Sequence, residues 1–101
     1  MKRYRLTVPA DQDLDGLWDY IAQDNIDAAD RFIDLLYDKF ALLASNPRIG
    51  RPCDDLRPGL FRFPVGNYVV FYRVAPRHIE IARIIHGARN IQTLFTRGES
   101  E

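Results

Sequence analysis

The segment His86-Gly-Ala-Arg-Asn90 gathers cationic and hydrogen-bonding side chains around a glycine. Histidine titrates near neutrality, so His86 has the chemistry of a general acid or base. The planar fork of Arg89 suits a phosphate or a carboxylate. Arg89 and Asn90 fall in a predicted loop, where side chains reach partners without disturbing the core. We therefore expect this segment either to bind an anion or to transfer a proton.

Structural roles are open for the same side chains. A histidine at the end of a strand often hydrogen-bonds the backbone, and this applies to His86. Arg83, in the preceding strand, could pair with a carboxylate such as Glu80 or with one on the helices.

The net charge of zero hides an uneven distribution along the chain. Residues 1–47 carry five Lys/Arg and nine Asp, a net of −4. Residues 48–98 carry nine Arg and three acidic residues, a net of +6, and Glu99 and Glu101 restore the balance. An arginine-only basic half indicates an anionic partner. The alternative is a solvated basic face that the acidic helices balance.

Length and composition predict one soluble, cytoplasmic domain. The 101 residues suit a single domain over 1–97, with 98–101 as a mobile acidic tail. The lone Cys53 cannot form an internal disulfide or a cysteine-built zinc site, and we expect neither a metal nor a cofactor. We also expect no leader and no membrane span.

Alternation and helical spacing predict the first half of the chain. A short strand over residues 4–8 should end at Pro9. A helix capped by Asp11 should follow, and a break at Asp24-Asn25 should separate it from a longer amphipathic helix that Pro47 ends. The short connection implies an antiparallel helix hairpin whose apolar stripe covers a sheet.

The second half should supply that sheet. Residues 46–59 are rich in Pro, Gly and Asp and predict an irregular crossing. Strands are expected over residues 60–63, where Pro64 ends the strand, and over 68–74 and 78–85. The fold class is therefore α+β, with an N-terminal strand and a helix hairpin packed on a mainly antiparallel sheet of three to four strands. The helices cover one face, so the other is partly open to a partner helix or strand.

Three motifs carry a family resemblance. They are Asp55-Leu-Arg-Pro-Gly-Leu, Phe63-Pro-Val-Gly-Asn-Tyr-Val-Val-Phe-Tyr-Arg73 and Ile81-Ala-Arg-Ile-Ile-His-Gly-Ala-Arg-Asn90. Together with the helix hairpin they resemble the ParE branch of the RelE/ParE toxins of bacterial toxin–antitoxin modules, over residues 4–94. The resemblance implies a small α+β toxin with a short C-terminal helical segment. It also implies a hetero-oligomer with a ParD-like antitoxin, which wraps the toxin and alone contacts operator DNA, and growth arrest by poisoning of DNA gyrase.

The same superfamily contains ribosome-dependent mRNA endonucleases of RelE type, which is the alternative function. Such chemistry needs a base, an acid and cations for the phosphate. RelE-like nucleases supply these from lysines and arginines on the sheet and from a C-terminal tyrosine. In this chain the position expected for that tyrosine looks to be Phe95, which has no hydroxyl, and no lysine follows Lys39. We therefore expect a non-catalytic gyrase inhibitor rather than an RNase that uses Arg83, His86 and Arg89. A third possibility is a non-toxic protein that only binds the antitoxin.

Two sets of candidate residues follow from these expectations. The target-binding candidates are cationic or polar: Arg57, Arg62, Arg83, His86, Arg89 and Asn90. The antitoxin-binding candidates are aromatic: Trp18, Tyr37, Phe61, Phe63 and Tyr72.

Overall fold

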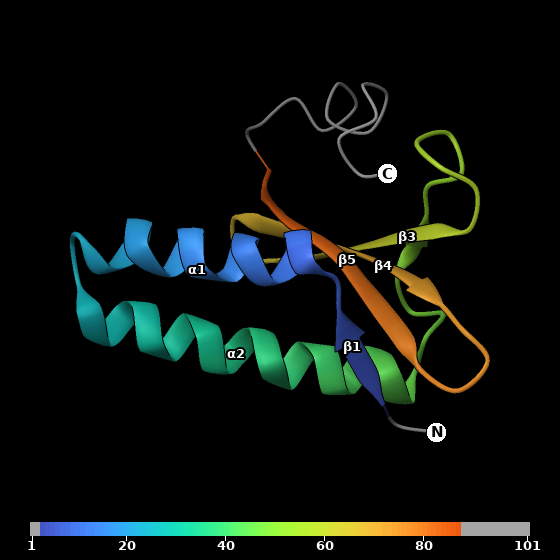
Figure 1. Ribbon diagram of the computed structural model, residues 1–101, viewed down its shortest axis with the longest axis horizontal. Coiled ribbons are helices and arrows are strands. Elements are labelled where there is room, and N and C mark those ends of the chain that lie inside the picture. The colour runs from blue at the N-terminus through green and yellow to red at the C-terminus, as the bar shows by residue number, and fades with distance from the viewer. Residues whose placement is uncertain (1–2, 88–101) are drawn as a thin grey trace.

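The computed structural model describes residues 3–87, which form two helices and five strands. The chain order is β1 (Tyr4–Leu6), α1 (Val8–Ala22), α2 (Ile26–Ser45), β2 (Arg51–Pro52), β3 (Leu60–Val65), β4 (Tyr68–Val74) and β5 (Ile79–His86) (Figure 1). The expected C-terminal helical segment and acidic tail lie outside the described residues. Neither α1 nor α2 is long and apolar enough to cross a membrane.

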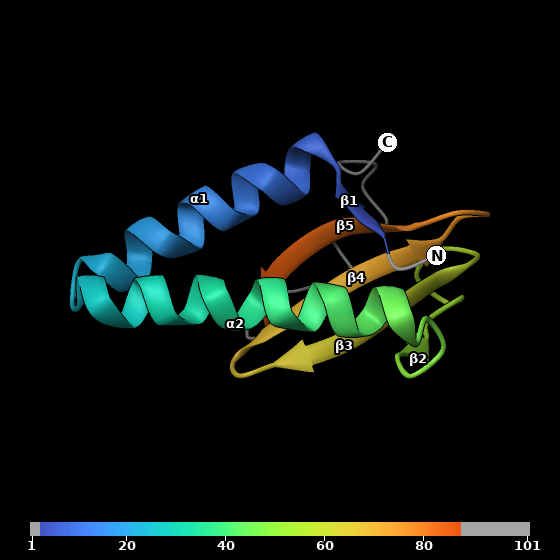
Figure 2. The ribbon, with the colours of Figure 1, turned by 90° about the horizontal axis from the view of Figure 1, so that it is seen from below.

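The strands form one mixed sheet in the order β1-β5-β4-β3-β2. β1 pairs with β5 in parallel, and the other three pairings are antiparallel. The expected α+β class and mainly antiparallel sheet are confirmed, but the expected count of three to four strands is wrong. The difference is β2, a two-residue strand too short to show any alternation of apolar and polar residues. Both helices lie on the same side of the sheet (Figure 2).

Helix α1 begins earlier than the sequence predicts. The N-cap is Thr7, whose side-chain oxygen accepts a hydrogen bond from the Ala10 amide at 3.1 Å. Pro9 therefore lies in the first helical turn, where its fixed φ is favourable and its missing N–H costs nothing. The expected cap at Asp11 and the expected strand through Val8 are wrong. The break before α2 is confirmed, with Asn25 as its N-cap.

Strand β3 continues through Pro64, which pairs with Val69, so the expected end of the strand at this proline is wrong. The Leu60 carbonyl accepts from the Cys53 amide on the β2 side of the strand. Because the hydrogen-bonding direction alternates, Pro64 also presents its backbone to that side. β2 pairs only with Phe61 and Arg62, so at Pro64 this side is a free edge and no sheet hydrogen bond is lost.

The two faces of the sheet carry separate apolar clusters. The larger cluster lies under the helices and includes Leu36, Phe40, Val70, Tyr72 and Ile81, all fully buried. The smaller one lies on the other face and consists of Cys53, Leu60, Phe71, Ala82 and Ile85, with Leu56 and Val69 packed against it. The loop after β2 thus covers part of the face that the helices leave free.

Candidate functional site

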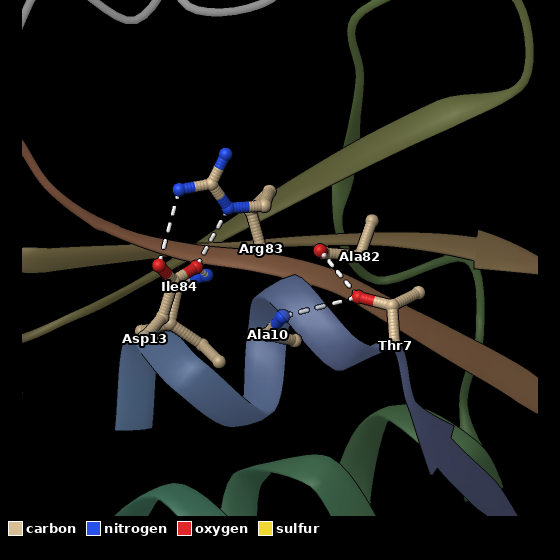
Figure 3. A network of polar contacts seen from close by, with 6 residues as sticks. All are labelled: Thr7, Ala10, Asp13, Ala82, Arg83 and Ile84. Carbon is tan, nitrogen blue, oxygen red and sulfur yellow. Dashed lines mark hydrogen bonds and ion pairs between the residues drawn. The ribbon is translucent and has the colours of Figure 1, made fainter. Parts of the chain in front are cut away.

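Beyond the end of β1, residues near the start of α1 form hydrogen bonds with the backbone of β5. The Thr7 amide donates to the Ile81 carbonyl at 3.0 Å, and the Thr7 hydroxyl donates to the Ala82 carbonyl at 2.8 Å. Asp13 Oδ2 accepts from the Ile84 amide at 2.9 Å. Figure 3 shows these side chains reaching from the N-terminal part of α1 to the strand. These three backbone groups of β5 are therefore satisfied, and this part of the edge is closed to another strand.

Arg83 is held by the same carboxylate. Its Nε donates to Asp13 Oδ2 at 2.8 Å and its Nη2 to Asp13 Oδ1 at 3.1 Å (Figure 3). The two side chains are only 14% and 15% exposed. Arg83 sits at a β-bulge, because the register shifts between Phe71 and Tyr72. The structural alternative for Arg83, a pairing with a helix carboxylate, is confirmed.

Glu80, the other carboxylate considered for Arg83, pairs instead with its cross-strand neighbour Arg73. The Arg73 Nε donates to Glu80 Oε1 at 3.1 Å, and the two side chains are each 37% exposed. The pair is open enough to water for its stabilising effect to be small.

His86 lies on the helix-facing side of the sheet. It is opposite Tyr68 in the register, and the two rings meet edge to face with centroids 5.1 Å apart. Tyr68 packs against the larger cluster and against Phe32. This places His86 at the end of β5, beside the helix-facing core.

Arg62 lies on the opposite face. Its neighbours Phe61 and Phe63 pack against the helix-side cluster, so alternation turns Arg62 to the other side. Arg51 of β2 is directly opposite Arg62 and shares its face. The sheet thus brings Arg62 together with Arg51, a residue that sequence reasoning missed, and separates Arg62 from His86. No pattern in the Pro-rich segment around Arg51 indicated a strand.

Of the remaining target-binding candidates, only Arg57 lies among the residues that the structure describes. Arg57 is half-buried in the loop between β2 and β3, where its carbonyl accepts from the Leu60 amide. Arg89 and Asn90 lie outside the described residues. Their role in binding a target therefore remains a sequence-based expectation.

Two antitoxin-binding candidates line one groove between the helices. Trp18 and Tyr37 form it together with Leu14 and Ile33, and its volume is about 170 Å³. The indole Nε1 of Trp18 donates to Asp30 Oδ1 at 2.9 Å, and Tyr37 is 40% exposed. Two acidic residues, Asp11 and Asp15, also line the groove. The groove thus combines apolar and aromatic side chains with negative charge.

The candidates on the sheet are less accessible. Phe61 and Phe63 are half-buried on the helix side of β3, and Phe61 stacks on Tyr72 with centroids 5.4 Å apart. Tyr72 itself is fully buried. Its hydroxyl donates to the Pro47 carbonyl at 2.7 Å and accepts from the Gly50 amide at 3.0 Å. Tyr72 therefore holds the segment after α2 against the sheet and offers no surface to a partner in this structure.

Burial changes the acidity of two groups in this region. Burial raises the pKa of the Tyr72 phenol, although the hydrogen bond from Gly50 opposes that shift. Burial likewise raises the pKa of the Cys53 thiol, which keeps it protonated and unreactive. Residues 3–87 contain no group of three or more His, Cys, Asp or Glu side chains that could hold a metal ion.

Comparisons with known proteins place these features in a family. A family model described as "ParE toxin of type II toxin-antitoxin system, parDE" matches residues 4–91. Toxin ParE1 of Caulobacter vibrioides is 38% identical over 91 residues, which cover 89% of this chain and 94% of that protein. Toxin ParE1 of Mycobacterium tuberculosis is 35% identical over 86 residues, which cover 83% of this chain and 88% of the other. A structure titled "Chromosomal ParDE TA system from P. aeruginosa" has the same fold, with a TM-score of 0.72, 24% identity and coverage of 85% of this chain and 96% of that one.

Proposed function

This chain belongs to the ParE family of type II toxin–antitoxin toxins, and from that membership we propose that it arrests growth by binding and poisoning DNA gyrase in the cytoplasm. A ParD-like antitoxin neutralises it in a hetero-oligomer, and the toxin meets operator DNA only through that antitoxin. The toxin itself acts as a binding protein and not as an enzyme.

The distribution of cationic side chains supports binding over RNA cleavage. Cleavage by the 2′-hydroxyl needs a base, an acid and phosphate-binding cations that converge within hydrogen-bonding distance. His86 is on the helix side of the sheet and Arg62 on the other side, so these two do not converge. Arg83 is engaged by Asp13 in two hydrogen bonds. This separation is the observation that carries the proposal, and the absence of lysine after Lys39 agrees with it.

The antitoxin partner is supported by the groove between the helices. A domain of this size buries only about 65% of its unfolded surface, so a ligand that binds only the folded form adds stability. An amphipathic helix is the element that fits an apolar groove between helices. Trp18 and Tyr37 would contact such a helix.

Two parallel assays on the purified toxin test the proposed target. One measures gyrase supercoiling together with the cleaved DNA complex, and the other measures ribosome-dependent cutting of mRNA. We expect loss of supercoiling and accumulation of cleaved DNA, with mRNA left intact. Codon-phased mRNA cuts with normal gyrase activity would instead establish the RelE-type nuclease. No effect in either assay, with unimpaired growth on expression, would indicate a non-toxic antitoxin-binding protein.

A further inference from the structure

An open pocket lies beside the paired arginines at the β2–β3 end of the sheet. Its volume is about 600 Å³, and both Arg51 and Arg62 line it. Apolar residues make up much of the rest, among them Ile49, Pro64 and Val69. Because Arg62 and Val69 point away from the helices, the pocket opens on the face that the helices leave free.

The two arginines repel one another in the isolated protein. They are direct partners in the β2–β3 register, so their Cβ atoms are about 5 Å apart, and like charges in such positions are destabilising. Within residues 3–87, neither guanidinium forms a salt bridge with a carboxylate. The nearby Asp54 accepts from the Gly59 amide instead. An anion between Arg51 and Arg62 would therefore remove a repulsion as well as form charge-assisted hydrogen bonds.

The apolar lining of the pocket indicates that the ligand carries an apolar group next to its anionic group. Ile49 is 49% exposed, Pro64 is exposed and Val69 is half-buried, so an apolar surface borders the charges. A bare phosphate would leave that surface in water, whereas a peptide can place a carboxylate on the arginines and an adjacent apolar side chain on Ile49 and Val69.

The edge of β3 restricts how that peptide is held. Pro64 presents its backbone to the free edge but has no N–H to donate. An added strand would therefore lack a hydrogen bond at this position. Where the peptide passes from Arg62 to Pro64, side-chain contacts must therefore supply the binding energy, because the backbone hydrogen bonds of an added strand cannot all form there.

We propose that this pocket binds an acidic segment of a partner protein, with a carboxylate held between Arg51 and Arg62 and an apolar side chain seated on Ile49 and Val69. The site does not depend on gyrase being the target, and it is distinct from the groove between the helices.

The test measures binding of short fluorescent peptides to the full chain by anisotropy. The peptides are a pooled set in which one Asp or Glu stands between apolar residues, and each has a twin with Asn or Gln in that place. Inorganic phosphate and a single-stranded oligonucleotide are titrated as competing anions. The protein variants are Arg51→Gln and Arg62→Gln, with Arg77→Gln as the matched control, because Arg77 is an exposed arginine in the distant β4–β5 turn. Thermal melting verifies that each variant is folded.

We expect the acidic peptides to bind about tenfold or more tightly than their amide twins, since charge-assisted hydrogen bonds are lost in the twins. Arg51→Gln and Arg62→Gln should each weaken binding to a similar extent, and Arg77→Gln should not. Equal binding of acidic peptides and amide twins, or equal loss in all three variants, would overturn the proposal. So would an absence of peptide binding, and so would tighter binding of the oligonucleotide with the same dependence on Arg51 and Arg62, which would make this a nucleic-acid site. None of these outcomes involves gyrase, so failure here is separate from failure of the proposed function.

Discussion

Asp13 of α1 and Arg83 of β5 are joined by two hydrogen bonds, and the same carboxylate accepts from the Ile84 amide. This relationship fixes the start of the helix hairpin to the strand that precedes the His-Gly-Ala-Arg-Asn motif. It also gives Arg83, the arginine of that strand, a structural role.

Removing this carboxylate should destabilise the protein. Asp13→Ala removes the carboxylate that accepts two hydrogen bonds from the largely buried Arg83 guanidinium and one from the Ile84 amide, which we expect to lower the free energy of unfolding by about 2–4 kcal/mol. Urea denaturation measures this change in the free energy of unfolding. Asp15→Ala, an exposed aspartate on the same helix, is the control and should cost under about 0.5 kcal/mol. In the double variant Asp13→Ala/Arg83→Ala the loss should be smaller than the sum of the single losses, and additivity would contradict the coupling.

The hydroxyl group of the buried Tyr72 should by itself contribute to the stability of the fold. Tyr72→Phe keeps the ring but leaves the Gly50 amide and Pro47 carbonyl unsatisfied, so we expect a loss of about 1–3 kcal/mol in unfolding free energy. Tyr20→Phe serves as the control, because Tyr20 is 68% exposed. Equal melting temperatures for the two variants would show that the hydroxyl contacts contribute nothing.

The same phenol should make stability depend on pH in alkali. Burial raises its pKa in the folded state above that in the unfolded state, which is about 10. The unfolded chain therefore releases this proton first, and the stabilisation is fully present below about pH 10 and lost as pH rises through the folded-state pKa. Unfolding free energies measured between neutral and strongly alkaline pH should fall less steeply in Tyr72→Phe than in the native sequence. Tyr4, Tyr68 and Cys53, whose pKa values burial also raises, remain in both proteins and contribute to the residual slope.

The groove between the helices should be required for antitoxin binding. Tyr37→Ser removes an aromatic contact from its wall, and we expect antitoxin affinity to fall about tenfold or more, as for an aromatic anchor at an interface. Calorimetric titration with the cognate ParD-like antitoxin measures this. Tyr20→Ser, at the tip of the hairpin, should bind normally. Unchanged affinity of Tyr37→Ser would place the antitoxin elsewhere.

Arg89, which follows β5 in the sequence, should be required for toxicity. Arg89→Ala should reduce growth inhibition while antitoxin binding is mostly retained, because the sequence predicts that this arginine contacts the target. Colony counts after induction measure toxicity, and co-purification measures antitoxin binding. Arg77→Ala should remain toxic. A parallel loss of toxicity and antitoxin binding in Arg89→Ala would show that Arg89 is structural.

Local patterns in the sequence were sufficient for much of the fold. The apolar spacing of α1 and α2 and the Asn25 break depend on residues close together in the chain. The apolar runs of β4 and β5 are likewise local. The start of α1 was also within reach, since Thr7 followed two residues later by Pro9 is a pattern typical of a helix N-terminus. Family membership came from the order of such motifs.

The sequence by itself determined the helix hairpin, the main strands and the kinship with ParE toxins, because these depend on residue types and spacing within each segment. Only the tertiary structure decided which side chains meet. The pairing of Arg83 with Asp13, the burial of Tyr72, and the positions of Arg62 and His86 on opposite faces all depend on strand register and on one bulge. Register arises from contacts between residues far apart in the chain, and a shift of one residue would turn each side chain to the other face.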